Sequence, residues 1–462
     1  MRAVLRRGAI DVAAAIGVAV ALLLVAGHVY PNYDAFFALI WGGDLAASRA
    51  PDYYAPGAPA PHPLLNALAA LTDPLGKDAA VEIFRALGPL SVGALCVGLF
   101  RLGEAVWDWR VGLIGAVVLF TREPTLIAGA RSYIDPATAA LIVWAAVLEA
   151  RRPRRGAPVL VLLALAGLLR PEVWLFSLLY LGWMLRDRGR PDRVRLVLLA
   201  ASGPVLWVAH TLLITETLLG PTHGAGLTLG SAPTQYGPTG LAAVPESFVR
   251  SVGNFMSPIP LLLAAAGLVA AYVHRQREAL LPFAIVAANA AAFVIIGLGG
   301  LPPVQRYLFP TAAMLSLFAG AAVVEGLRLA SRRRVVVAAA VAVLAAAVVW
   351  DARRVDAARD LLTSEQAVQA DLDALVHDPT ASAILRRAPV VRLQNPRTLP
   401  LLAYWTDRPP QDFPTGAPAS GAFLAARTPA AERYLHGRVG GLPAPPPGAA
   451  VANASWSLHE LP

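Results

Sequence analysis

The sequence predicts an α-helical bundle that crosses a membrane many times and ends in a small α/β domain outside it. Of the 462 residues, 56% are hydrophobic and only 15% are charged, whereas soluble domains contain about 25% charged residues. The apolar residues also fall in long blocks, and a block of about 20 residues is the length of a membrane-spanning helix. This composition excludes an ordinary soluble enzyme, a disordered chain and a fibrous protein.

Eleven apolar runs are the predicted spans. The first follows the basic start "MRAVLRRG" and reaches about Tyr30 with no clear cleavage site, so it predicts an uncleaved helix rather than a signal peptide. The short runs at 157–170 and 171–186 form either a tight hairpin or one broken helix. The other runs lie at about 80–101, 111–128, 134–150, 195–218, 258–273, 279–298, 308–327 and 335–350.

Arginines decide the predicted orientation, because basic residues gather in short loops on the cytoplasmic side of a membrane. With the amino terminus in the cytoplasm, every strongly basic short loop falls on the inner side of the cell membrane. The basic clusters are Arg2 with Arg6 and Arg7, Arg101 with Arg110, "RRPRR" at 151–155, "RDRGRPDRVR" at 186–195, "HRQRE" at 274–278 and "RLASRRR" at 328–334. The net charge of +9 is thus explained by topology, which predicts contact with membrane lipids and not with nucleic acid.

Four segments then face outward: the long first loop 31–79, the short segment 129–133, the Gly-, Pro- and Thr-rich loop 219–257, and the tail. We therefore predict a membrane domain at 1–350 and an extracytoplasmic domain at 351–462.

The tail has the pattern of a small α/β unit. It predicts a helix near 352–377, a strand near "APVVRL" and a helix near "RTLPLLAYW". Elsewhere the chain shows no inverted repeat of the kind that many transporters carry.

Metal and phosphate-loop motifs are absent from the sequence. Cys96 is the one cysteine, so an internal disulfide and a cysteine metal site are excluded. No histidine and carboxylate cluster has metal-ligand spacing. The sequence therefore predicts no cofactor and no assigned metal site, and leaves the use of a divalent metal undecided.

Asp34 is the first candidate catalytic residue. It lies at the outer mouth of the first span in "YPNYDAFFALIWGGD", among aromatic side chains. A partly desolvated carboxylate at that depth can act as a general base on a hydroxyl group. The alternative is an aspartate that caps a helix at 35–47, since a helix N-terminus favours an acid.

Asp135 is the second candidate, in "GARSYIDPATAALIVW". Asp before Pro136 is a common way to cap a helix, and this explains the pair without any catalytic role. Arg131 can instead pair with Asp135 or meet an anionic ligand.

Further charged groups interrupt apolar sequence at Arg122-Glu123 and at Arg170-Pro171-Glu172. Such groups are expensive inside a membrane and face a cavity or one another, so they form structural pairs or a site. Arg306, beside Tyr307 in "GLPPVQRYLFP", suits a lipid phosphate or is an ordinary snorkelling arginine.

These motifs, in this order and on one predicted side, resemble the GT-C superfamily of membrane glycosyltransferases over about residues 1–350. Within this superfamily, the chain is most similar to the protein O-mannosyltransferases, the lipid A aminoarabinose transferases and related bacterial families. A departure is that Asp34 is followed by Ala35, where many relatives carry two adjacent acids. The matching stretches are the Asp34 segment, "HPLLNALAAL" with His62 in place of a proline, "IFRALGPLSVGALCVGLF" with Arg85, "YIDPATA" with Asp135, "LLRPE.W" with Glu172, and "RYLFP" with Arg306 and Tyr307.

The resemblance implies transfer of a sugar from a polyprenyl-phosphate donor to an acceptor glycan, lipid or protein on the outer face. The reaction is a single displacement with inversion. Asp34 would be the general base, Asp135 would orient the acceptor or the arginines, and Arg306 with Arg131 would stabilise the phosphate. The loop 219–257 would cover the site.

Three alternatives stay open. A transporter or flippase also carries polar groups in its spans, although here the candidate acids gather at one face. A glycan ligase or polymerase uses the same donor with a later catalytic loop. A GT-C scaffold without activity would serve as a partner protein.

Overall fold

The computed structural model describes residues 2–186, 190–217, 244–299, 304–330, 334–437 and 439–461. The chain divides into two compact units. The first comprises Met1–Ala26, Ala86–His210 and Ala232–Ala358, and the second comprises Gly27–Arg85, Thr211–Ser231 and Arg359–Pro462. The second unit therefore joins the predicted first outer loop to most of the tail.

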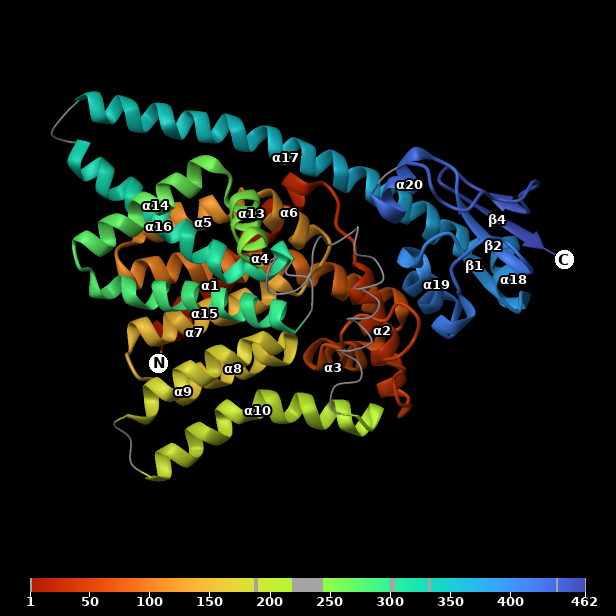
Figure 1. Ribbon diagram of the computed structural model, residues 1–462, viewed down its shortest axis with the longest axis horizontal. Coiled ribbons are helices and arrows are strands. Elements are labelled where there is room, and N and C mark those ends of the chain that lie inside the picture. The colour runs from red at the N-terminus through yellow and green to blue at the C-terminus, as the bar shows by residue number, and fades with distance from the viewer. Residues whose placement is uncertain are drawn as a thin grey trace. The chain divides into compact units, whose positions relative to one another are not determined.

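The first unit is a bundle of helices (Figure 1). Its elements are α1 (Arg2–Ala26), most of α4 (Lys77–Val106), α5 (Trp109–Phe120), α6 (Glu123–Ala130), α7 (Asp135–Arg151), α8 (Ala157–Leu169), η2 (Pro171–Val173), α9 (Trp174–Leu185), most of α10 (Arg190–Thr215), α13 (Val244–Met256), α14 (Pro258–Val273), η4 (Arg277–Ala279), α15 (Leu280–Leu298), η5 (Gln305–Leu308), α16 (Phe309–Ala330) and the first part of α17 (Arg334–His377).

Helices occupy all eleven of the predicted apolar ranges. Within the described ranges, five helices are long and apolar enough to cross a membrane, and the number rises to seven if each of two bent pairs counts as one span. The two short runs are separate helices, α8 and α9, joined through η2. The total of eleven spans stays a prediction.

Two predicted segments differ from the structure in shape. The predicted single span 111–128 is bent by 68° between α5 and α6, because Pro124 begins a new helix. The predicted outer loop 219–257 lies outside the described residues up to position 243, and from Val244 it is the helix α13. This helix meets α14 at a bend of 107°, where Ser257 adopts a φ of +65°.

Arg122 explains how the bend between α5 and α6 is held. Its side chain is 1% exposed and forms an ion pair with Asp351 of α17. The guanidinium also donates to the carbonyl oxygens of Val118 and Met256, the latter at 2.9 Å. Since a buried charge without a partner is strongly destabilising, this network fixes three chain segments together. Arg122 is thus paired, but with Asp351 and not with its sequence neighbour Glu123, which pairs with Arg354 at 3.0 Å.

The core of the first unit is centred on α16, which packs against α5 and α14. Gly267 of α14 lies directly on the backbone of α16. A Cβ atom at this position would come within 2.0 Å of the carbonyl oxygen of Phe318. The helices can approach this closely only because residue 267 has no side chain.

The second unit contains a four-stranded sheet in the order β1-β2-β4-β3. Strands β1 and β2 are parallel, whereas β4 pairs antiparallel with both β2 and β3. Its elements are α2 (Tyr33–Ala46), α3 (Pro63–Thr72), η1 (Asp73–Leu75), α18 (Pro379–Arg387), β1 (Val391–Leu393), η6 (Pro396–Thr398), α19 (Leu399–Thr406), η7 (Pro410–Asp412), β2 (Gly421–Ala426), α20 (Pro429–His436), β3 (Val451–Ala452) and β4 (Trp456–Leu461), together with the end of α17.

The predicted strand and the second predicted helix of the tail correspond to β1 and α19. The predicted helix at 352–377 is confirmed, but it is not separate from the apolar run before it. The last apolar run and this helix are one continuous helix, α17, of 44 residues. The physical reason is that no Gly or Pro interrupts the sequence over this range.

Polar and aromatic contacts bind the first-loop segment to the tail within the second unit. Lys77 donates to the carbonyl oxygen of Tyr404 at 2.7 Å and pairs with Asp407 at 2.6 Å. The ring of Tyr404 lies edge-on to Phe36 at 5.8 Å. Burial, aided by nearby carboxylates, raises the pKa of the Tyr404 hydroxyl above its usual value, so this group stays neutral.

We expect Gly267→Ala to destabilise the protein by about 1–3 kcal/mol, because the new methyl group meets the α16 backbone. Gly326→Ala is the matched control, since Gly326 lies inside a helix as well, in α16, and has no atom within 4 Å of an added Cβ. The control should change stability by no more than ~1 kcal/mol. Unfolding midpoints in a denaturing detergent titration measure both effects, and equal midpoints for the two variants would contradict the packing argument.

Candidate functional site

A buried ion pair forms the centre of the candidate site in the first unit. The guanidinium of Arg170 donates to the carboxylate of Asp135 at 2.5 Å, with side chains that are 8% and 3% exposed. Arg170 adopts an extended backbone between α8 and η2, as a residue before proline favours. The break in the helix therefore turns this side chain toward the start of α7.

Two aromatic rings and a second arginine complete this cluster. The guanidinium of Arg170 lies over the ring of Tyr307 at 4.7 Å. Arg306 lies over the ring of Tyr133 at 5.2 Å and near that of Tyr307 at 5.9 Å. Stacking on aromatic faces holds each guanidinium in place while leaving N–H groups in its plane able to donate.

Asn289 of α15 fixes the position of η5, which carries Arg306 and Tyr307. Its side-chain nitrogen donates to the carbonyl oxygen of Tyr307 at 3.1 Å. Its side-chain oxygen accepts from the Thr311 hydroxyl at 2.7 Å. Because this buried amide bonds to Tyr307 of η5 and to Thr311 of α16, it fixes the junction between the two elements.

A small cavity lies within this group, and Glu172 is among the residues that line it. The space open to water is about 20 Å³, which is room for about one water molecule. The other lining residues include Asp135, Thr138, Arg170, Asn289, Arg306, Tyr307 and Phe309. We call the set of Asp135, Arg170, Glu172, Asn289, Arg306 and Tyr307 the Asp135 cluster.

The Asp135 cluster has one unused acceptor and one unused donor. The Oδ2 atom of Asp135 and the Nε atom of Arg170 are buried and lack a hydrogen-bond partner among the described residues. A hydroxyl group or water both donates and accepts, so it can satisfy both atoms. The cluster is thus suited to holding one small polar group at the edge of an apolar bundle.

The structure corrects the capping interpretation of Asp135. Asp135 is the first residue of α7, its carboxylate is bound to Arg170, and no side chain caps this helix. The predicted pairing of Asp135 with Arg131 is also wrong, since Asp135 pairs with Arg170 instead. Arg131 lies at the C-terminal end of α6 and is not among the residues that line the cavity.

Asp34, His62 and Arg85 belong to the second unit. Asp34 lies in the first turn of α2, and the cap of this helix is Asn32, whose side chain accepts from the backbone N–H of Ala35 at 2.8 Å. The capping interpretation of Asp34 is therefore wrong. His62 is buried just before α3, and Arg85 pairs with Glu82 at 2.5 Å.

Four of the predicted site residues thus come together, namely Asp135, Glu172, Arg306 and Tyr307. Arg170 and Asn289 were not among the predicted site residues. The signal for Arg170 was its place beside Glu172 in an apolar stretch, and the signal for Asn289 was a lone amide in "AIVAANAAAFV".

No group of three or more His, Cys, Asp and Glu side chains in the described ranges could hold a metal ion.

Comparisons with known proteins add evidence about the fold. No protein-family model matches the chain, and no curated protein matches it. Two solved structures of the Archaeoglobus fulgidus oligosaccharyltransferase resemble it, one tethered by a disulfide to an acceptor peptide containing the NVT sequon and one in the apo form. Both have a TM-score of 0.51, with 10% and 11% sequence identity.

This chain shares the GT-C fold. The alignments cover 87% of this chain and 63% and 64% of the archaeal protein, so the chain spans less than two thirds of that protein's length. A likeness at this sequence identity shows the fold alone. Both this fold and the long apolar helices indicate a membrane protein.

We expect Asp135→Asn to destabilise the protein by about 3–5 kcal/mol, because it leaves the buried Arg170 without a counter-charge. The double variant Asp135→Asn with Arg170→Gln should be more stable than Asp135→Asn alone, with a coupling of about 0.5–3 kcal/mol. The measurement is the unfolding midpoint of each variant.

The exposed pair of Glu246 and Arg250 provides the control for this cycle. Glu246→Gln removes a carboxylate from an ion pair at the surface and should cost less than ~1 kcal/mol. Strictly additive effects at Asp135 and Arg170 would show that their contact contributes nothing.

Proposed function

We propose that this protein is a membrane glycosyltransferase that moves a sugar from a polyprenyl-phosphate donor to an acceptor at the outer face of the cell membrane. The observation that carries the proposal is the Asp135 cluster, which gathers two arginines and two carboxylates in a helical unit with the GT-C fold. The proposed topology places the amino terminus in the cytoplasm and the domain at 351–462 outside.

The leaving group in this reaction is a lipid phosphate, which is stable as an anion. It needs positive charge more than it needs an acid. We assign this role to Arg306, which is stacked between Tyr133 and Tyr307 and is preorganised without a large conformational cost. Arg131 is a second candidate for the same role.

Asp34 is the proposed general base. It would accept the proton of the acceptor hydroxyl as the oxygen attacks the anomeric carbon and the bond to phosphate breaks, with inversion. Asn32 already caps α2, so the Asp34 carboxylate is not needed for that purpose. A general base typically contributes about 10²–10⁴-fold to a rate.

The remaining predicted residues would bind substrate. Asp135 holds Arg170 and would orient the arginines, while its unused oxygen accepts from a hydroxyl. Glu172 and Tyr307 line the same cavity. His62 and Arg85 are proposed contacts of the first-loop segment with the acceptor or the donor.

The proposal also covers the class of sugar and the class of acceptor. The sequence motifs favour transfer of a single hexose or pentose, as in the O-mannosyltransferases and aminoarabinose transferases. The archaeal protein of the same fold was solved with an acceptor peptide, which favours including peptides beside glycans and lipids in an acceptor panel. A transporter or flippase is the second candidate, because the Asp135 cluster is buried among apolar helices.

We expect Asp34→Asn to lower turnover by roughly 10²-fold or more with folding intact. The assay is release of polyprenyl phosphate from a panel of labelled polyprenyl-phosphate sugars by protein in nanodiscs. Asp44→Asn is the matched control, because Asp44 lies on the same helix and forms an exposed pair with Arg49. Wild-type release that persists in Asp34→Asn would exclude Asp34 as the base.

We expect Arg306→Gln to lower release of the lipid phosphate by roughly 10²-fold, since it removes the charge proposed to stabilise the leaving group. Arg328→Gln removes one positive charge from the other end of α16, where Arg328 is 60% exposed, and should leave release unchanged. An equal loss in both variants would attribute the effect to net charge instead of to the phosphate contact.

A further inference from the structure

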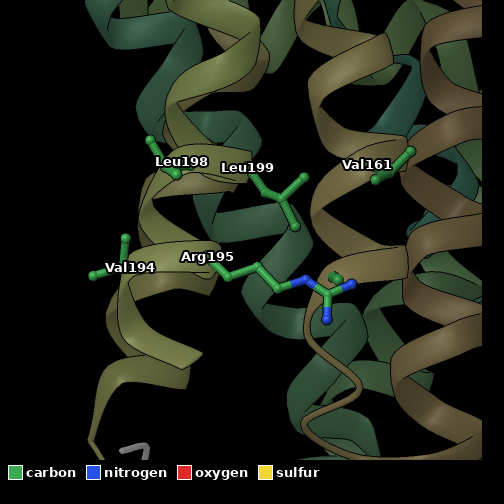
Figure 2. A pocket seen from close by; sticks show the side chains of 6 residues that line it. Val161, Val194, Arg195, Leu198 and Leu199 are labelled. Carbon is green, nitrogen blue, oxygen red and sulfur yellow. The ribbon is translucent and has the colours of Figure 1, made fainter. Parts of the chain in front are cut away.

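A second binding feature lies in the first unit, away from the Asp135 cluster. It is an apolar groove between α8 and α10 with a volume of about 490 Å³, which falls in the roughly 300–1,000 Å³ range of ligand sites. Its walls are Ala157 and Val161 from α8 and Val194, Arg195, Leu198 and Leu199 from α10. Figure 2 shows the Arg195 side chain extending from α10 across the groove toward α8.

The helices on either side of the groove are packed against each other. A Cβ added at Gly203 of α10 would lie 3.3 Å from the carbonyl oxygen of Ala164 of α8, so the two helices approach closely there. Leu160, Met184 and Leu196 form a small buried core that joins α8, α9 and α10, and the lining residue Leu199 packs against it. The groove is therefore a built feature of three packed helices and not a gap between loose segments.

Among the described residues that line the groove, Arg195 is the charged one. Its side chain is exposed, and no hydrogen bond or ion pair joins its guanidinium to another residue of the described ranges. A guanidinium is always charged, and several donors in one plane match the oxygens of a phosphate. The groove therefore offers apolar walls and one unused cation at the same place.

The surroundings indicate where this groove lies in a bilayer. Its lining residues lie near the starts of α8 and α10, which adjoin the basic sequence segments 151–155 and 186–195. The positive-inside rule predicts that both segments are cytoplasmic. Trp183 of α9 is nearly half exposed and lies under the guanidinium of Arg154 at 4.9 Å. An exposed tryptophan beside arginines is typical of the membrane–water interface.

We propose that this groove binds one anionic phospholipid of the inner leaflet, with an acyl chain along α8 and α10 and the headgroup phosphate on Arg195. The charge of the loops decides between phospholipid classes, because clustered arginines near the inner surface favour an anionic headgroup over a zwitterionic one. The proposed sugar transfer takes place at the outer face, so this site is separate from the chemistry and does not depend on it.

The experiment is native mass spectrometry of the full-length protein released from detergent after incubation with phosphatidylglycerol or phosphatidylcholine of matched acyl chains. Wild type should retain one phosphatidylglycerol in preference to phosphatidylcholine. Arg195→Gln should weaken retention about fivefold, which corresponds to the ~1 kcal/mol that one basic residue contributes near an anionic lipid surface. Arg195→Lys, which keeps the charge, should retain most of the binding.

Two further variants make the result specific. Arg152→Gln removes an exposed positive charge from the same predicted side without touching the groove, and it should bind like wild type. Val161→Phe fills the groove and should lose the lipid while Arg195 is intact.

The proposal is overturned by equal retention of the two phospholipids, by undiminished retention in both Arg195→Gln and Val161→Phe, or by an equal loss in Arg152→Gln. Retention of a copurified polyprenyl lipid in place of phosphatidylglycerol would also overturn it. A failure of glycosyl transfer would leave every one of these measurements unchanged.

Discussion

An arginine inside an apolar bundle needs a counter-charge, and the pair of Arg170 and Asp135 is where this requirement shapes the site. Arg170 and Arg122 both interrupt a helix immediately before a proline-containing turn. Each adopts an extended backbone that turns the side chain inward, and each pairs with a carboxylate on another helix, Arg170 with Asp135 of α7 and Arg122 with Asp351 of α17. A charge that is costly in the membrane thus joins two separate helices in a specific way. The same tie arranges η5, because Tyr307 stacks on the paired Arg170.

The sequence predicted the helices well and their partners poorly. Apolar blocks locate helices because burial in a bilayer core demands about 20 apolar residues, and this property is local. The partner of Arg122 is 229 residues away, so only the packed structure identifies it. Asp135 illustrates the same limit. An acid before proline at a helix start is explained by capping alone, yet its carboxylate is committed to Arg170. The continuity of α17, in contrast, could have been predicted, since no helix-breaking residue lies between the apolar run and the polar helix that follows.

The link between the first-loop segment and the tail depends on the one lysine of the sequence. Lys77 lies at the start of α4 and reaches the C-terminal end of α19, where it binds the Tyr404 carbonyl and Asp407. An ammonium group suits this position because it donates in several directions and complements the negative end of a helix dipole. A second tie joins Tyr30 to Glu365, which also pairs with Arg397. Position 365 belongs to the part of α17 in the second unit, so this helix helps to hold the loop in place.

These ties bear on Asp34, the proposed general base, because such a group must be held within a fraction of an ångström of its working position. Three aromatic rings pack in a row along α2. The ring centroids of Tyr33 and Phe37 are 5.2 Å apart, and those of Phe37 and Trp41 are also 5.2 Å apart. The Tyr33 hydroxyl donates to the carbonyl oxygen of Gly57 at 2.7 Å, and Phe36 packs against Tyr404 of the tail. Aromatic packing of this kind is rigid, so it can fix the backbone that carries Asp34. The first-loop segment is therefore a folded part of one unit with the tail.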